Sequence, residues 1–269
     1  MLKDITFGQY FESNSFVHKL DPRSKLLLLI LIIVSIFVAQ NAFALSVVAI
    51  FIILSVFLSK IPIKMYLKNI KAILPIIIFT MIINLFYNAS GTILISFWKL
   101  TITTGSIYRA LYMSARILLL IISSAELTYT TTPNELTDAI EKLLAPLRFV
   151  GLKNAVHTLA MMMTIALRFI PTLIEETQKI MNAQKARGAD LENGKLIERI
   201  KALVPILIPL LISSVRRAYE LAEAMECRCY NGGEGRVRMK QLKYSISDYI
   251  SFVVVLVVMA VVILINIFL

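Results

Sequence analysis

The sequence predicts an all-α polytopic membrane protein with about five transmembrane helices and long amphipathic helices on the cytoplasmic side. Hydrophobic residues make up 58% of the 269 positions, more than the roughly 45–50% of soluble domains, and they gather in long runs with little charge. Charged residues are concentrated after position 127, in segments that remain rich in Leu, Ile and Met. The chain is therefore expected to divide into an N-terminal membrane part (1–127), a cytoplasmic helical region (128–245) and a final span (246–269).

Five apolar runs are expected to cross the bilayer, which takes about 20 helical residues. They are 26–39, 42–58, 72–86, 107–127 and 250–269. Only Gln40 and Asn41 separate the first two runs, so one long tilted helix is the alternative to two helices joined by a turn. A single helix would be ~50 Å long, well beyond a hydrocarbon core of ~30 Å, and two spans are preferred. The polar first 24 residues contain no apolar signal segment, so the first run is expected to stay in the membrane.

The net charge of +11 is interpreted through the positive-inside rule rather than as a sign of nucleic-acid binding. Four lysines follow the second run at intervals of three to four residues, and they predict a short interfacial helix on the cytoplasmic face. They are Lys60, Lys64, Lys68 and Lys71. The loop before the second run carries no charge, so the N-terminus is expected inside and, after five spans, the C-terminus outside. The short apolar run 92–98 is expected in the outer interface, after a turn at 88–91.

Three helical segments are expected in the cytoplasmic region, and prolines in the second and third are expected to break or kink them. The segments are 135–147 after Thr132-Pro133-Asn134, 155–187 with a break at Pro171, and 195–230 with Pro205 and Pro209. The uncharged part of the third, 202–215, has only 14 residues, which is fewer than a span needs. The last two segments are therefore expected to be amphipathic helices that lie on or partly in the bilayer. A turn at 231–233 is expected to end the third.

The sequence contains no recognisable catalytic or metal-binding pattern. The only cysteines, Cys227 and Cys229, have no further Cys and no nearby His to complete a metal site, and His18 and His157 are far apart. The glycines at 232–235 lack the Lys-Ser/Thr of a phosphate-binding loop. No cofactor, no metal and no ATPase activity of the chain itself are expected.

Two helix ends in the cytoplasmic region resemble each other. Arg187 follows Ala183 by four residues, as Arg228 follows Ala224, so each pair shares one helix face. Small residues flank both arginines, which suits a helix end that enters a groove while the guanidinium forms forked hydrogen bonds. An arginine favoured at a helix C-terminus by the helix dipole is the alternative. The residues alone leave both interpretations open, and the repetition favours binding.

Three stretches, taken together, carry a resemblance. They are the segment from Gly8 to Leu26 with Asp21-Pro22-Arg23, the segment from Leu167 to Glu176, and the two arginine tips. In this order they resemble the EcfT family, the transmembrane coupling subunits of energy-coupling factor (ECF) transporters, over most of the chain. The second tip departs from the family pattern, because Cys227-Arg228-Cys229 stands where Ala-Arg-Gly or Ala-Arg-Ala is usual. The arginine is kept and its neighbours stay small.

The resemblance implies the partners and the mechanism. Members of the family work with two ABC-type ATPase subunits and a small membrane-embedded substrate-binding protein, the S component, in vitamin or micronutrient uptake. The tips Ala186-Arg187-Gly188 and Cys227-Arg228-Cys229 would each dock into one ATPase, and ATP-driven motion would pass along the helices to the S component. Residues expected to serve that contact are Met161, Met162, Met163, Pro171, Pro205 and Pro209. Methionines give an adaptable surface and prolines allow bending, with ordinary packing as the alternative for the methionines.

The N-terminal signature also has a structural interpretation. Asp21 is expected to cap the first helix and Pro22 to begin it, while Arg23 and Lys25 anchor it at the lipid headgroups. This interpretation is preferred to a direct chemical role.

Two other classes of function compete with that of a coupling subunit of the cell membrane. A membrane-embedded enzyme acting on a lipid or isoprenoid needs several intramembrane acids or histidines, and Glu126 is the only carboxylate near a membrane interior. A secondary transporter that binds solute itself needs inverted repeats and polar, broken helices, of which the first four runs show little. The expected protein is thus a multi-pass scaffold with a cytoplasmic N-terminus and coupling region.

Overall fold

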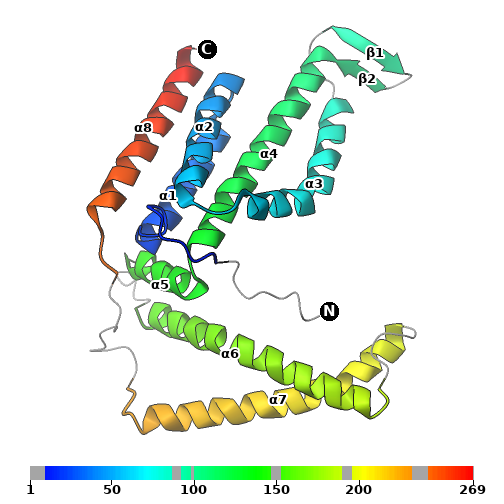
Figure 1. Ribbon diagram of the computed structural model, residues 1–269, viewed down its shortest axis with the longest axis vertical. Coiled ribbons are helices and arrows are strands. Elements are labelled where there is room, and N and C mark those ends of the chain that lie inside the picture. The colour runs from blue at the N-terminus through cyan, green and yellow to red at the C-terminus, as the bar shows by residue number, and fades with distance from the viewer. Residues whose placement is uncertain are drawn as a thin grey trace. The chain divides into compact units, whose positions relative to one another are not determined.

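The computed structural model describes residues 10–86, 92–97, 100–146, 153–189, 196–231 and 242–268. These residues form eight α-helices and one β-hairpin (Figure 1). The helices are α1 (Pro22–Val38), α2 (Ala42–Ser59), α3 (Ile63–Phe86), α4 (Thr104–Thr130), α5 (Pro133–Leu143), α6 (Lys153–Ala186), α7 (Leu196–Glu226) and α8 (Ile246–Phe268). The antiparallel strands β1 (Ile93–Phe97) and β2 (Leu100–Thr103) connect α3 to α4. The predicted all-α class is confirmed, with this hairpin as a small addition.

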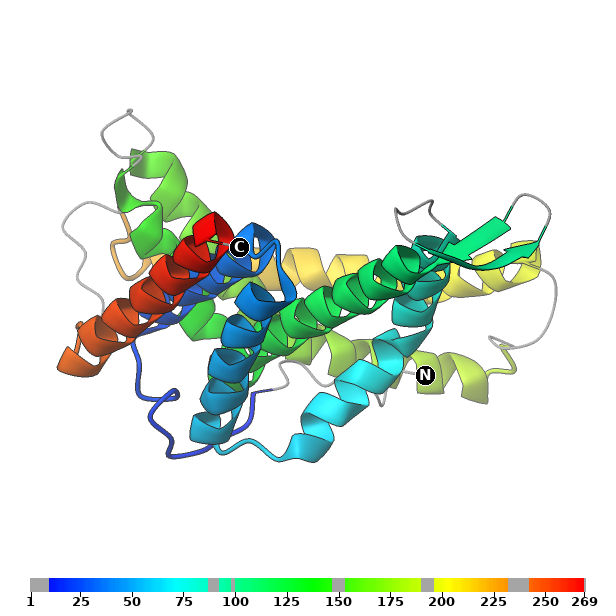
Figure 2. The same cartoon turned by 90° about the horizontal axis from the view of Figure 1, so that it is seen from above.

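The chain forms two compact units. The described residues between 10 and 139, together with 242–268, make up the bundle unit, and those between 140 and 231 make up the second unit, which contains α6 and α7. In the bundle unit, α1, α2, α4 and α8 pack side by side, and α3 packs along α4 (Figures 1 and 2). Side chains of all four helices meet in one apolar core, whose members include Ile36, Val48, Ile52, Leu119 and Val262.

Six described helices are long and apolar enough to cross a membrane, namely α2, α3, α4, α6, α7 and α8. After Lys25, α1 is also apolar except for Ser35, but with 17 residues it is slightly shorter than these helices. All five predicted spans therefore occur as helices in the bundle unit. The first two are separate helices joined at residues 39–41, so the alternative of one long helix is wrong.

Two predictions about the helices are corrected by the structure. The lysine-rich segment is not a separate interfacial helix, because it continues into the third span as the single helix α3 with Pro75 inside. The run 92–98 contributes the strand β1, and its expected place in the outer interface stays a prediction. The helices α6 and α7 run without a break through Pro171, Pro205 and Pro209. The predicted turns at 88–91 and 231–233 lie outside the described residues, except for Asn231.

The segment before α1 is held in place by short polar contacts. Asp21 caps α1, accepting a hydrogen bond from the Arg23 backbone at 2.9 Å, and Pro22 is the first helical residue, as predicted. The His18 ring bridges the Phe11 carbonyl (2.8 Å) and the Ser15 hydroxyl (2.6 Å). Partial burial lowers the pKa of His18 below its usual 6.5, which favours the neutral ring that can both donate and accept in this bridge.

Lys25 is not the exposed anchoring side chain that the sequence predicted. Its side chain is buried, and Nζ donates to the carbonyls of His18 (3.1 Å) and Thr130 (2.8 Å). Thr130 is the last residue of α4, where carbonyls lack partners within the helix. Lys25 therefore provides hydrogen bonds to the C-terminal end of α4. Its positive charge also interacts favourably with the negative end of the helix dipole there.

At the C-terminal end of α1, a cation from α4 donates to a backbone carbonyl in the same way. Arg116 of α4 donates from Nη2 to the Ala39 carbonyl at 2.5 Å, beside the Tyr112 hydroxyl, which donates to the same oxygen. Thus α1 and α4 each supply a cation to the other helix's C-terminal end. Helix α8 secures both ends of α1, because Asp248 accepts from the Asp21 backbone at 2.9 Å and Asn266 donates to the Val38 carbonyl at 2.6 Å.

Candidate functional site at two arginine-bearing helix ends

The helices α6 and α7 lie against each other in opposite directions within the second unit (Figure 1). Glu176 of α6 accepts a hydrogen bond from the Ser213 hydroxyl and forms an ion pair with Arg217 Nη2 at 3.0 Å. Further along α6, Gln184 Nε2 contacts the carbonyl of Pro205 at 3.5 Å. Contacts that move forward on one helix and backward on the other define an antiparallel pair.

An apolar groove of about 300 Å³ continues this contact on the other side of the ion pair. Its α6 wall is formed by Ile165, Phe169 and Leu173, and its α7 wall includes Leu221 and Met225. The contact between the helices therefore extends on both sides of Glu176. Apolar packing provides most of it, and the ion pair fixes which residues face each other.

The two arginines occupy equivalent positions at the two free ends of this pair. Arg187 lies eleven residues after Glu176, and Arg228 lies eleven residues after Arg217. At 1.5 Å per helical residue each arginine is about 16 Å along its helix from the ion pair. Because the helices are antiparallel, the two tips point in opposite directions from a common centre. The spacing of the tips is a property that the sequence motif alone does not contain.

Both helix ends have the same hydrogen-bonding pattern. The amide of Ala189 donates to the carbonyl of Gln184, and that of Tyr230 donates to Met225, in each case at 3.0 Å and five residues back. This is the Schellman arrangement, in which one residue after the helix adopts a left-handed conformation. Gly188 has φ 86° and Cys229 has φ 54°. Cys229 thus takes the backbone role of the glycine, and the helix ends there rather than at the glycine turn predicted for 231–233.

The six residues of the two tips are all exposed. Neither guanidinium forms a hydrogen bond or ion pair with another described residue, so both are available to a partner. The surroundings differ in charge: Lys179 and Lys185 precede Arg187, whereas Glu223 and Glu226 precede Arg228. The helix ends are alike in backbone geometry and unlike in electrostatic character.

The remaining predicted contact residues lie along the same two helices. Met162 is exposed, while Met161 and Met163 are half-buried. Pro171, Pro205 and Pro209 are exposed on continuous helices. Sequence reasoning quoted Glu176 as part of a motif without giving it a role, and it missed Arg217. Within the described residues, no cluster of three or more His, Cys, Asp or Glu side chains is placed to hold a metal ion.

Known proteins match this chain over most of its length. The family model described as cobalt transport protein (CbiQ) matches residues 13–239. The energy-coupling factor transporter transmembrane protein EcfT of Ruminiclostridium cellulolyticum is 52% identical over 248 residues, covering 92% of each chain. This chain belongs to the EcfT family. The EcfT proteins of Clostridium kluyveri and Acidaminococcus fermentans are each 48% identical, over 98% and 95% of this chain and 97% and 94% of their own.

Membership of the EcfT family makes the chain a transmembrane component of an ECF transporter. Its relatives are named as transporter subunits rather than enzymes, and its apolar helices make it a multi-pass membrane protein. Both arginine tips of this EcfT-family chain lie inside the region matched by the family model. The family match therefore includes the residues that the two helix ends present.

Proposed function

We propose that the chain couples two ATPase subunits to a substrate-binding S component in a vitamin or micronutrient importer. In this assembly Arg187 and Arg228 each dock into one ATPase, and α6 and α7 pass the ATP-driven motion to the S component. ATP hydrolysis takes place in the partner subunits. The N-terminus and the second unit lie on the cytoplasmic side, where the ATPases have access to both helix ends.

The observation that carries this proposal is the equal spacing of the two arginines from the ion pair at the centre of the α6–α7 contact, which we call the equal arms of α6 and α7. Two like partners, related by an approximate two-fold axis, require two like contact points on opposite sides of a centre. The arginines meet this requirement, since each lies eleven residues from the Glu176–Arg217 ion pair. A helix-dipole role for each arginine would not require equal arms, nor would it require both guanidinium groups to be free of described partners.

The chemistry of each tip supports docking by insertion. An exposed guanidinium presents five N–H donors in a fixed fork, which suits bidentate binding of a carboxylate or of paired carbonyls. A left-handed residue directly after each arginine turns the chain away from the helix axis, so the tip is narrow enough to enter a groove. Along the helices, exposed Met162 and the exposed prolines present the surface that we assign to the S component.

Charge reversal at the tips tests the proposal. We expect Arg187→Glu and Arg228→Glu each to abolish binding of one ATPase, and the double variant to lose both ATPases and substrate uptake. The measurements are co-purification from membranes and uptake into proteoliposomes. Arg216→Glu is the matched control, because Arg216 is also exposed on α7 but lies away from the tip. A double variant that still binds both ATPases and transports normally would show that the arginines do not dock.

A further inference from the structure

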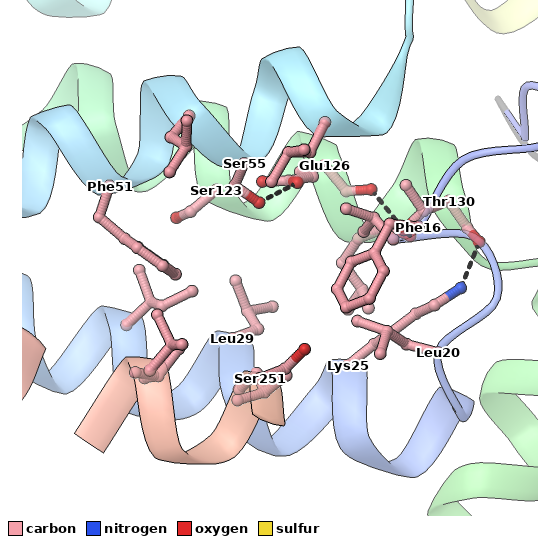
Figure 3. Close-up of a pocket in the computed structure, with 18 of the residues that line it drawn as sticks. Phe16, Leu20, Lys25, Leu29, Phe51, Ser55, Ser123, Glu126, Thr130 and Ser251 are labelled. Atoms are coloured by element: carbon pink, nitrogen blue, oxygen red, sulfur yellow. Dashed lines mark hydrogen bonds between the residues drawn. The ribbon is translucent and has the colours of Figure 1, made fainter. Parts of the chain in front are cut away.

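The bundle unit encloses a cavity of about 270 Å³ that the proposed coupling role does not use. Its wall is formed by α1, α2, α4 and α8 together with the segment before α1 (Figure 3). Most side chains of this wall are apolar, including Leu28, Ile32, Phe51 and Val255. The polar or charged ones are Lys25, Ser55, Ser123, Glu126, Thr130 and Ser251. A space of this size and lining within a helix bundle excludes a strongly hydrated ligand and suits a hydrocarbon chain.

The rim of the cavity consists of exposed apolar side chains on helices that have the length and composition of membrane spans. Leu54 and Leu58 lie on α2, and Ile250 and Val254 lie on α8, each between 43% and 56% exposed. Exposed apolar residues on such helices face acyl chains when the helices are in a bilayer. The cavity therefore opens toward lipid, not toward water.

One end of the cavity carries a buried cation that makes no direct contact with a described carboxylate, although Glu135, Asp248 and Asp21 act on it electrostatically from farther away. Lys25 lines this end and uses two of its three N–H donors on backbone carbonyls. Among the described residues, no carboxylate lies within 4.0 Å of its ammonium group. Exposed Lys19 lies in the segment just before it and adds to the positive potential. A lipid phosphate at this end would accept the third N–H of Lys25 and give it a direct anionic contact.

A polar pair lies about one helical turn deeper, on the wall formed by α2 and α4. The Ser55 hydroxyl donates to Glu126 Oε1 at 2.5 Å, and Figure 3 shows both groups beside the cavity. Glu126 precedes Thr130 by four residues, a rise of about 6 Å along α4. With a phosphate near Lys25, this pair would lie at the level of the ester groups of a glycerolipid, and the apolar wall beyond it would surround an acyl chain.

We propose that this cavity binds one acyl chain of an anionic glycerophospholipid, whose phosphate lies at the Lys25 end. The occupant comes from the surrounding bilayer and enters between α2 and α8. It fills the space between the four helices of the bundle and gives Lys25 a direct anionic contact. The proposal concerns the bundle unit alone and does not depend on how the arginine tips bind.

Adjacent valines on α8 provide a matched test. Val254 lies at the rim, whereas Val253 is 59% exposed and does not line the cavity. The full chain, with the partners that co-purify with it, is reconstituted in nanodiscs with equal phosphatidylglycerol and phosphatidylcholine, then extracted with mild detergent for native mass spectrometry. We expect wild type and Val253→Trp to retain one phosphatidylglycerol per chain. Val254→Trp fills the entrance and should retain at least about fivefold less.

Two further variants separate the parts of the proposal. Ser251→Phe fills the cavity from its wall and should reduce retention as Val254→Trp does, since Ser251 donates only to the backbone of its own helix. Lys25→Gln should lower the ratio of retained phosphatidylglycerol to phosphatidylcholine toward one, a ratio that does not depend on how much protein folds. Equal retention by Val253→Trp and Val254→Trp, retention of a free fatty acid, or equal retention of both phospholipids by wild type would overturn the proposal.

Discussion

Two residues at the arginine tips show how the same backbone geometry is reached with different side chains. Gly188 and Cys229 both adopt positive φ, which for a residue with a Cβ costs roughly 1–2 kcal/mol through crowding against the following carbonyl. At Gly188 an added Cβ would meet no atom within 4 Å, so only the backbone conformation opposes a larger residue there. The sequence pattern identified the small residues, but their shared conformation is visible only in the structure.

Exchanging these residues should change the stability of the helix ends in opposite directions. We expect Cys229→Gly to stabilise the end of α7 by about 1 kcal/mol and Gly188→Ala to destabilise the end of α6 by a similar amount. The measurement is hydrogen exchange of the amides in the last turn of each helix. Cys227→Gly is the control, because Cys227 does not have positive φ and its replacement should give no protection. Faster exchange in Cys229→Gly than in wild type would contradict the assignment.

For the helices of the bundle unit, the sequence predicts the membrane spans but not the contacts between them, as α1 and α4 illustrate. The apolar runs gave all five spans in the bundle unit, because hydrophobic length is a direct requirement of the bilayer. The lysine segment was assigned a separate helix, but lysine is a good helix former and no breaking residue separates it from the span, so α3 continues. The exchange of cations between α1 and α4 depends on tertiary contact and has no local signature in the sequence.

Removing one of these cations should destabilise the bundle unit. We expect Lys25→Met to lower the free energy of unfolding by about 2 kcal/mol, because it removes charged hydrogen bonds to two carbonyls and leaves them without that partner. Thermal unfolding followed by circular dichroism in detergent provides the measurement. Lys19→Met, on an exposed neighbour in the same segment, should change stability by less than about 0.5 kcal/mol. Equal effects of the two substitutions would argue against the role of Lys25 at the end of α4.

At the scale of the whole molecule, the two arginine tips can move together only if the α6–α7 contact holds the two helices in a fixed relative position. The ion pair between Glu176 and Arg217 lies at its centre, equally far in sequence from both tips. The family resemblance predicted that both tips act in docking, and this remains a prediction. The equal arms could not be derived from the sequence, since periodicity defines each helix but not which residues of two helices face each other.

Breaking the central ion pair should therefore separate docking from transmission. In Glu176→Ala both tips remain intact, so we expect ATPase association close to wild type while uptake falls severalfold. Co-purification and proteoliposome uptake measure the two effects side by side. Glu175→Ala is the matched control. Glu175 is the exposed neighbour of Glu176 on α6 and has no described partner, so its replacement should leave both ATPase association and uptake unchanged. Loss of ATPase binding in parallel with uptake would place Glu176 in docking itself.

The contacts that secure α1 also set an order of assembly. The backbone groups at the two ends of α1 find partners in Arg116 of α4 and in Asp248 and Asn266 of α8, which leave the ribosome long after α1 has done so. Until α8 has been inserted, the Val38 carbonyl at the C-terminal end of α1 lacks its Asn266 partner. Helix α8 thus completes the packing of α1, and a nascent chain cut short before α8 should remain a substrate for membrane quality control.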